Sequence, residues 1–240
     1  MNKWTQSVLL SFLLSLASIA QAEDWYTVEV IIFANTGNEA LDDEYWPEIN
    51  EVPLKTSITL AEPTQSDDEL TAFQKLTPSL LSLNQELAQL KRSGNYRVLY
   101  HEGWMQPVAE TQQPQPVRIQ GGNILDNGMF ELDGYIGIGK GRYLHFRPDL
   151  YFSRSLSASE SAMLLKTQQA ASSEITETAN AQELTTLAAS TATRAIQPVE
   201  LFIPETLTVN LNQARRMRSK ELHFIDHPLF GVLIEVKPVE

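Results

Sequence analysis

Side chains suited to binding an anion are concentrated near the C-terminus, in Leu211–Val236. An apolar, histidine-containing segment predicted to turn, Leu222–His227, follows a run of cations there, and an apolar strand is predicted at Gly231–Val236. The candidate binding residues of this stretch are Arg215, Arg216, Arg218, His223, Asp226 and His227, with Lys220 beside them. Guanidinium groups bind carboxylates through two parallel hydrogen bonds, so the stretch has the chemistry of an anion site.

A second stretch, Lys140–Leu150, has the same character, because a Leu-His-Phe triplet follows cations in both. We expect the two stretches to lie in one sheet. Alternation along a strand would place Arg216, Arg218 and Lys220 on one face. The second stretch adds three candidate binding residues, Arg142, Tyr143 and His145.

Two other interpretations of these residues remain open. Charged runs are usually solvated surfaces, and histidines with apolar neighbours are usually hydrogen-bonded structural residues. Alternatively, the chain is a metal-dependent hydrolase whose metal candidates are His223, Asp226 and His227, with His145 as a possible third histidine. Pro228 places His223 and His227 in a turn, where their ring nitrogens need not converge.

Other catalytic constellations are missing from the sequence. The chain has no cysteine, which excludes a thiol nucleophile. It has no Ser-x-x-Lys of penicillin-binding enzymes, and His101–Glu102 lacks the second histidine of a His-Glu-x-x-His zinc motif. We therefore expect no enzyme and no cofactor.

The N-terminus predicts export. Lys3 precedes a 13-residue, largely apolar run, Val8–Ala20, and an Ala-x-Ala site follows. These are the parts of a secretory signal peptide covering residues 1–22 and cleaved after Ala22, and the run is shorter than the ~20 residues that span a bilayer. We expect a periplasmic protein without a membrane anchor. The formal net charge of −12 argues against nucleic acid as a partner.

The first half of the chain predicts two strands around a helix. Trp25–Phe33 is apolar on both faces, as in a central strand. The helix is predicted to begin with Thr77 as N-cap and to end at Gly94, with an apolar stripe of Leu80, Leu83, Leu87 and Leu90. Tyr96–Trp104 alternates again, with Tyr96, Val98, Tyr100 and Trp104 on one face. This order predicts a βαβ unit or half of a split one.

The second half predicts mostly strands. A short strand is expected at Val117–Ile119, and Phe130–Phe146 is either one long strand or two with a glycine-rich bend. Asp149–Arg154 would continue a hairpin across Arg147–Pro148. Strand character resumes at Leu201–Leu211.

Two segments differ in composition from the rest. Residues 34–76 hold ten acids and only two lysines, which predicts a solvated acidic excursion. Residues 155–200 contain no aromatic residue and are rich in Ser, Ala, Thr, Gln and Glu, which predicts a flexible insert. The fold class is therefore α+β, mostly antiparallel, in a single domain over residues 23–240.

Several motifs together resemble one family. They are WYTVEVIIFAN at Trp25–Asn35, YRVLYHEGWMQPV at Tyr96–Val108, LDGYIGIGKGRYLHFRPDL at Leu132–Leu150 and RRMRSKELHFIDHPLFGVLIEV at Arg215–Val236. The chain resembles the CsiV family of periplasmic peptidoglycan-binding proteins. The resemblance implies a non-enzymatic protein that promotes wall synthesis through an outer-membrane lipoprotein, the activator of a bifunctional penicillin-binding protein.

Three hypotheses follow. In the first, the chain binds peptidoglycan itself: arginines pair with stem-peptide carboxylates, while Tyr143, Trp46 or Trp104 stacks on sugars. In the second, it is an adaptor that reaches the wall only through a partner protein. In the third, it is a metal-dependent wall hydrolase.

Overall fold

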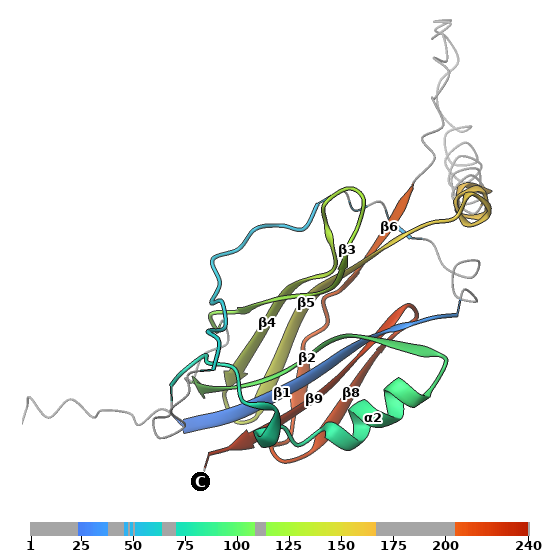
Figure 1. Ribbon diagram of the computed structural model, residues 1–240. Helices are drawn as coiled ribbons and strands as arrows, with labels where there is room; N and C mark the ends of the chain where they lie inside the picture. The colour runs from blue at the N-terminus through green and yellow to red at the C-terminus, as the bar shows by residue number, and fades with distance from the viewer. Residues whose placement is uncertain are drawn as a thin grey trace, which may run out of the picture.

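Two antiparallel sheets stacked face to face form the body of the protein (Figure 1). The computed structural model describes residues 24–37, 46–47, 49, 51–63, 71–108, 114–166 and 205–239. The expected signal peptide lies outside the described residues.

The first sheet has the order β2-β1-β9-β8 and contains β1 (Asp24–Asn35), β2 (Tyr96–Val108), β8 (Leu222–His227) and β9 (Phe230–Pro238). The second sheet has the order β3-β4-β5-β6, with the short β7 also paired to β5. Its strands are β3 (Val117–Ile124), β4 (Phe130–Lys140), β5 (Leu144–Ser155), β6 (Thr206–Leu211) and β7 (Arg215–Met217).

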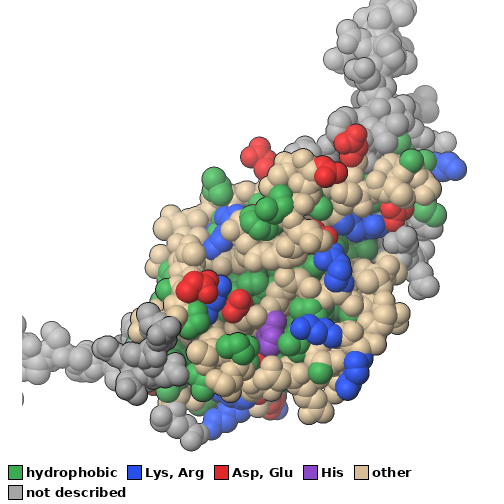
Figure 2. Space-filling view, viewed as in Figure 1, with side chains coloured by type: hydrophobic (Ala, Val, Ile, Leu, Met, Phe, Trp, Pro, Cys, Tyr) green, Lys and Arg blue, Asp and Glu red, His purple; other side chains and the backbone are tan. Residues whose placement is uncertain are grey.

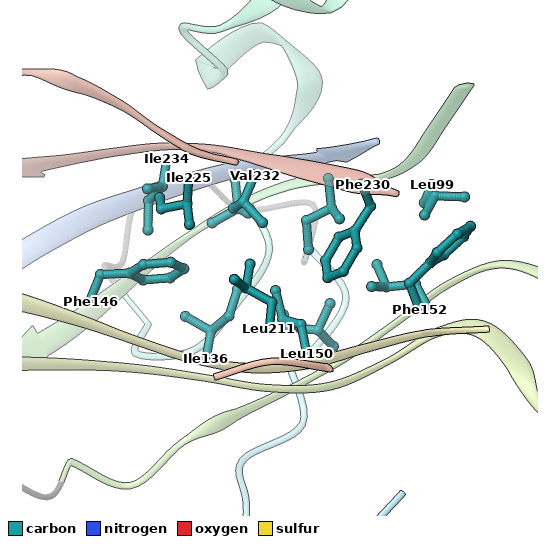
Figure 3. Close-up of a cluster of buried hydrophobic side chains, with 14 of the residues drawn as sticks. Leu99, Ile136, Phe146, Leu150, Phe152, Leu211, Ile225, Phe230, Val232 and Ile234 are labelled. Atoms are coloured by element: carbon teal, nitrogen blue, oxygen red, sulfur yellow. The ribbon is translucent and has the colours of Figure 1, made fainter. Parts of the chain in front are cut away.

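The main core lies between the two sheets. Side chains from the inner faces of both sheets point toward one another there (Figure 3). Phe146 and Leu150 from β5 meet Ile225 from β8 and Phe230 from β9, and all four are buried. Burial of each such side chain stabilises the fold by about 1.5–3 kcal/mol.

Strand β1 is central, as its sequence predicts. It pairs with β2 on one side and with β9 on the other. Val28, Val30 and Ile32 face the main core, whereas Ile31 and Phe33 face a second, smaller cluster under the helix α2 (Asn84–Arg92). Apolar residues on both faces of β1 therefore have a burial partner on each side.

The predicted βαβ unit is wrong in its pairing. The order strand, helix, strand is observed, but β1 and β2 are antiparallel neighbours. A register shift beside Ile32 leaves Leu99 as an extra residue in β2, so Val98 packs under α2 while Tyr100 and Trp104 pack into the main core. The predicted single face for these side chains is therefore wrong, because one inserted residue reverses the alternation.

The helix begins later than predicted. Thr77 precedes only a 3₁₀ turn, Pro78–Leu80, and makes no capping hydrogen bond within the described residues. Leu83, Leu87 and Leu90 pack against the first sheet, as the stripe predicts, but Leu80 is exposed. The C-cap is Ser93 rather than Gly94, and its N–H bonds to the carbonyl groups of Gln89 and Leu90.

Strands β4 and β5 form a hairpin whose bend is at Gly141–Tyr143, which agrees with the two-strand alternative. The expected turn at Arg147–Pro148 is wrong, because both residues lie within β5. Pro148 has no N–H to donate. It pairs with Ile136 of β4 on one side, and on the other side it lies in a gap, because β7 ends its pairing at Phe146 and β6 begins its own at Leu150.

The described part of the acidic segment is not simply solvated. Trp46, Leu60 and Leu76 are buried. Residues 51–60 cross the second sheet: the carbonyl and N–H of Ile58 bond to the strand at Arg118 and Pro116. Lys55 forms an ion pair with Asp149 of β5. This strap covers part of the outer face of the second sheet.

The segment predicted as a flexible insert begins with ordered structure. Ser155 is the last residue of β5, the Leu156 N–H bonds to the Glu205 carbonyl, and 158–166 are helical. Ser157 and Glu160 form a capping box: the Glu160 carboxylate accepts from the Ser157 N–H at 2.8 Å, and the Glu160 N–H donates to Ser157 Oγ at 3.3 Å. Leu164 is buried in the main core. The prediction is wrong for 155–166, and 167–200 lies outside the described residues.

We expect Leu164→Ala to lower the free energy of unfolding by about 2 kcal/mol, since it removes buried methyl groups from the core. Leu165→Ala is the matched control, because Leu165 is only partly buried, and its cost should be under about 1 kcal/mol. Urea unfolding followed by circular dichroism measures both. Equal midpoints for Leu164→Ala and the wild type would contradict the packing of this helix.

Candidate anion-binding site

The two basic stretches meet in the second sheet through β7. Its residues pair with β5 as Arg215 with Phe146, Arg216 with His145, and Met217 with Leu144. The expectation of one shared sheet is therefore correct for these residues. It is wrong for the Leu-His-Phe triplets, because Leu222–His227 is not a turn but the strand β8, in the other sheet.

Neighbouring arginines of β7 lie on opposite faces. Met217 and its partner Leu144 are buried in the main core, so Arg215, two residues before Met217, shares the inner side at the rim. Arg216 lies on the outer face beside His145. The predicted common face of Arg216, Arg218 and Lys220 is wrong, because β7 ends at Met217.

Tyr143 joins Arg216 to Arg142. The guanidinium carbon of Arg216 lies 4.4 Å from the centre of the Tyr143 ring, and that of Arg142 lies 5.7 Å from it. Each distance is within the range of a cation–π contact, worth about 0.5–1 kcal/mol at an exposed site. We call Arg142, Tyr143 and Arg216 the arginine–tyrosine cluster.

The arginines of the cluster lack acidic partners within the described residues. Six cations on other elements are paired with acids: Lys55–Asp149, Lys75–Glu62, Arg97–Glu131, Arg118–Asp133, Lys140–Asp24 and Arg154–Glu160. Arg218, beyond the cluster, has Glu221 at 3.5 Å. In a chain with 30 acids, unpaired arginines gathered at one place are available to an external anion.

Arg147 extends this basic surface along β5. It lies two residues after His145 and so on the same outer face. Its Nε is buried and has no hydrogen-bond partner in the described part of the chain. A buried donor without a partner costs about 1–3 kcal/mol, so a ligand acceptor at this position would be stabilising.

The histidines and the acid of β8 do not converge. Nε2 of His223 lies 3.2 Å from both the backbone N and the backbone O of Arg218. His227 packs between Trp46 and Phe230 with ring centres 5.8 and 4.8 Å away, and its Nδ1 accepts from the Leu229 N–H. Asp226 is exposed on the other face of the strand. Within the described residues, no group of three or more His, Asp or Glu could hold a metal ion.

His227 should make stability depend on pH. Burial lowers the pKa of His227, and nearby Asp226 opposes this only in part. The neutral form of His227 is thus favoured in the folded protein. As the pH falls below the ordinary pKa of 6.5, His227 is protonated more readily in the unfolded chain, so the free energy of unfolding falls. We expect the stability of His227→Asn to fall less than that of the wild type between pH 7 and 5 in urea titrations. Parallel curves would contradict this assignment.

A comparison of the sequence with models of known protein families shows what kind of protein carries this surface. The family model described as "Peptidoglycan-binding protein, CsiV" matches residues 6–239. The chain belongs to the CsiV family. A search of curated proteins and a search of solved structures each give no match. In this CsiV-family protein, none of the helices among the described residues is long and apolar enough to cross a membrane.

Four of the nine predicted site residues come together in this CsiV-family fold: Arg142, Tyr143, His145 and Arg216. Arg215, Arg218, His223, Asp226 and His227 lie on other faces or in other contacts. On the face shown in Figure 2, basic and acidic side chains are both present among hydrophobic ones. The binding chemistry of the arginine–tyrosine cluster comes from two unpaired guanidinium groups held at one tyrosine.

A second polar cluster was missed by sequence reasoning. Glu29 is 2 % exposed on β1, and one carboxylate oxygen lies 2.9 Å from His101 Nε2. The carboxylate also accepts from the Ser82 N–H, the Ser82 hydroxyl and the Leu83 N–H at 2.7–2.9 Å. Burial raises the pKa of Glu29, but these hydrogen bonds together lower it below its ordinary value.

The residue types resemble a catalytic triad, but the order of contacts differs. In a Ser-His-acid triad the imidazole lies between the hydroxyl and the carboxylate. Here the carboxylate lies in the middle and accepts the Ser82 hydroxyl itself. The cluster instead satisfies the backbone N–H groups of Ser82 and Leu83, immediately before α2. The signal in the sequence is a glutamate within an otherwise apolar central strand.

Proposed function

We propose that this CsiV-family protein binds peptidoglycan in the periplasm through the arginine–tyrosine cluster, without enzymatic activity, and promotes wall assembly through an outer-membrane lipoprotein activator of a penicillin-binding protein. The family match over residues 6–239 carries the proposal of wall binding. The predicted signal peptide supports the periplasmic location. The arginine–tyrosine cluster supports the location of the contact, because peptidoglycan carries carboxylates and guanidinium groups bind them.

The overall charge of the protein makes a local contact necessary. At a net charge of −12 the chain as a whole is repelled by an anionic wall. Repulsion between separated charges is screened beyond about 10 Å at 0.1 M salt. Attraction must therefore come from unpaired cations that approach the ligand closely, and Arg142 and Arg216 meet this condition.

We expect the purified protein to co-sediment with isolated sacculi without any other protein. Because charge-assisted contacts weaken as salt screens them, the bound fraction should fall between 0.05 and 0.5 M NaCl, with a Debye length that shrinks from roughly 14 to 4 Å. Sedimentation followed by gel densitometry measures this. Binding that appears only after the lipoprotein is added would instead support the indirect adaptor.

The promotion of synthesis needs its own measurement. Glycan polymerisation by the bifunctional penicillin-binding protein should rise when this protein is added together with the lipoprotein, and should not change when it is added alone. An unchanged rate with the complete set of proteins would contradict the proposed link to the lipoprotein. Wall binding would stand independently of that result.

A further inference from the structure

The aromatic side chains that the sequence suggested for sugar stacking are either buried or in contact with arginine. Arg216 lies over the Tyr143 ring at 4.4 Å, so a sugar stacking on that face would have to displace a guanidinium group. Trp46 is 5 % exposed and Trp104 is 0 % exposed, both within the main core. Burial thus removes Trp46 and Trp104 as sugar-stacking residues, and a sugar on the Tyr143 ring face beneath Arg216 would compete with that arginine.

The same contacts prepare the arginines for an anion. The contact with Tyr143 restrains each guanidinium group, and its N–H donors remain free of any carboxylate in the described chain. An arginine has five such donors, which match the two oxygens of a carboxylate. A restrained side chain also loses less conformational entropy when the ligand binds.

Further donors lie along the same face. His145 is opposite Arg216 in the β5–β7 pairing, and Arg147 follows His145 with its buried, unpartnered Nε. The resulting surface carries donors and positive charge from Arg142 to Arg147, and no Asp or Glu occurs between these two positions. This composition fits an extended ligand with free carboxylates better than a neutral sugar chain.

We infer that the arginine–tyrosine cluster binds free carboxylates of the stem peptides, and that the protein recognises the peptide part of peptidoglycan rather than its glycan strands. This inference rests on the proposed wall binding and names the chemical group that is bound. Arg142 and Arg216 form the primary contacts, Tyr143 positions them, and Arg147 offers an additional donor.

Wild-type protein can test the ligand side. Three probes are compared by co-sedimentation: intact sacculi, insoluble chitin as a neutral amino-sugar glycan without peptides, and sacculi whose carboxylates have been converted to amides. We expect at least tenfold weaker binding to the second and third probes. Amidation is decisive, because an acidic protein would bind the neutralised wall more strongly if only long-range charge mattered.

Variants test the protein side. Arg142→Ala and Arg216→Ala should each weaken binding to intact sacculi about tenfold, while Arg215→Ala should leave it unchanged. Arg215 is the matched control, because it is the neighbouring exposed arginine of the same strand but lies on the other face. Arg216→Lys should restore the binding only in part, since an ammonium group lacks the two-donor fork. Circular dichroism verifies that each variant is folded.

The outcomes are distinguishable. If intact sacculi do not bind the wild type, the proposed function itself is wrong. If the wild type binds intact sacculi, and binds peptide-free glycan or amidated sacculi equally well, only the carboxylate inference is overturned. Equal losses for Arg215→Ala and Arg216→Ala would also overturn it, since the effect would then reflect net charge and not the cluster.

Discussion

Glu29→Ala is expected to lower the free energy of unfolding by about 3–5 kcal/mol, because the change leaves several buried polar groups without a partner. The carboxylate of Glu29 accepts hydrogen bonds from Ser82, Leu83 and His101 at a site where it is 2 % exposed. Water cannot replace these contacts without opening the packing of α2 on the first sheet. Urea unfolding followed by circular dichroism measures the loss.

Glu235→Ala is the control for this prediction. Glu235 pairs with Glu29 across the strands and bonds to Ser82 Oγ and Lys237, but it accepts no backbone N–H among the described contacts. Its removal should cost about 1 kcal/mol or less. A loss for Glu29→Ala no larger than that for Glu235→Ala would contradict the anchoring role of Glu29.

The lowered pKa of Glu29 adds a pH dependence. A carboxyl group whose folded-state pKa is below its ordinary value of 4.5 contributes stability above that pH, and the contribution is lost as the pH falls through the folded value. The stability difference between the wild type and Glu29→Gln should therefore be constant near neutral pH and shrink below about pH 4.5. A difference that grows in acid would have the wrong sign.

Patterns that repeat along one element were predictable from the sequence. The apolar residues on both faces of β1 predicted that both faces are buried and that the strand is central. The leucine spacing predicted the body of α2. The beginning of α2 was not predictable from local signals. The backbone N–H groups of Ser82 and Leu83, immediately before the helix, are satisfied by Glu29, which lies 54 residues earlier than Leu83. A Thr-Pro pair at residues 77–78 is a local cap signal, but the chain just before the helix is anchored by a distant carboxylate.

The candidate site was predictable only in part. The similarity of the two basic stretches correctly suggested contact, since Arg216 pairs with His145. It could not reveal that the two Leu-His-Phe triplets belong to different sheets, because alternation states which residues share a face and not which strand is the neighbour. The division of Arg215 from Arg216 depends on the register of a three-residue strand, which no pattern in the sequence specifies.

The flexible-insert prediction failed for a related reason. Average composition over 155–200 concealed a Ser-x-x-Glu capping box at Ser157–Glu160, which is a specific helix signal of only four residues. The helix that follows then buries Leu164 in the main core. A short motif next to a strand was more informative here than the composition of the whole segment.

Gly134→Ala is expected to cost about 3 kcal/mol or more, because the added methyl group would collide with backbone atoms. Gly134 lies in β4 opposite Leu150 of β5, with a φ of 146° that other residues rarely adopt. A Cβ built there would lie 2.2 Å from the carbonyl oxygen of Asp149. Strands β4 and β5 would have to separate at the middle of the second sheet.

Gly141→Ala is the matched control, since Gly141 lies in the turn of the same hairpin and a Cβ there meets nothing within 4 Å. Its effect should be within about 0.5 kcal/mol. Urea unfolding compares the two variants, and sacculus co-sedimentation then tests the consequence for binding. Because β5 also carries His145 and pairs with Arg216, opening the hairpin should weaken wall binding as well as stability. A Gly134→Ala protein with the wild-type urea midpoint would contradict the close approach of the two strands.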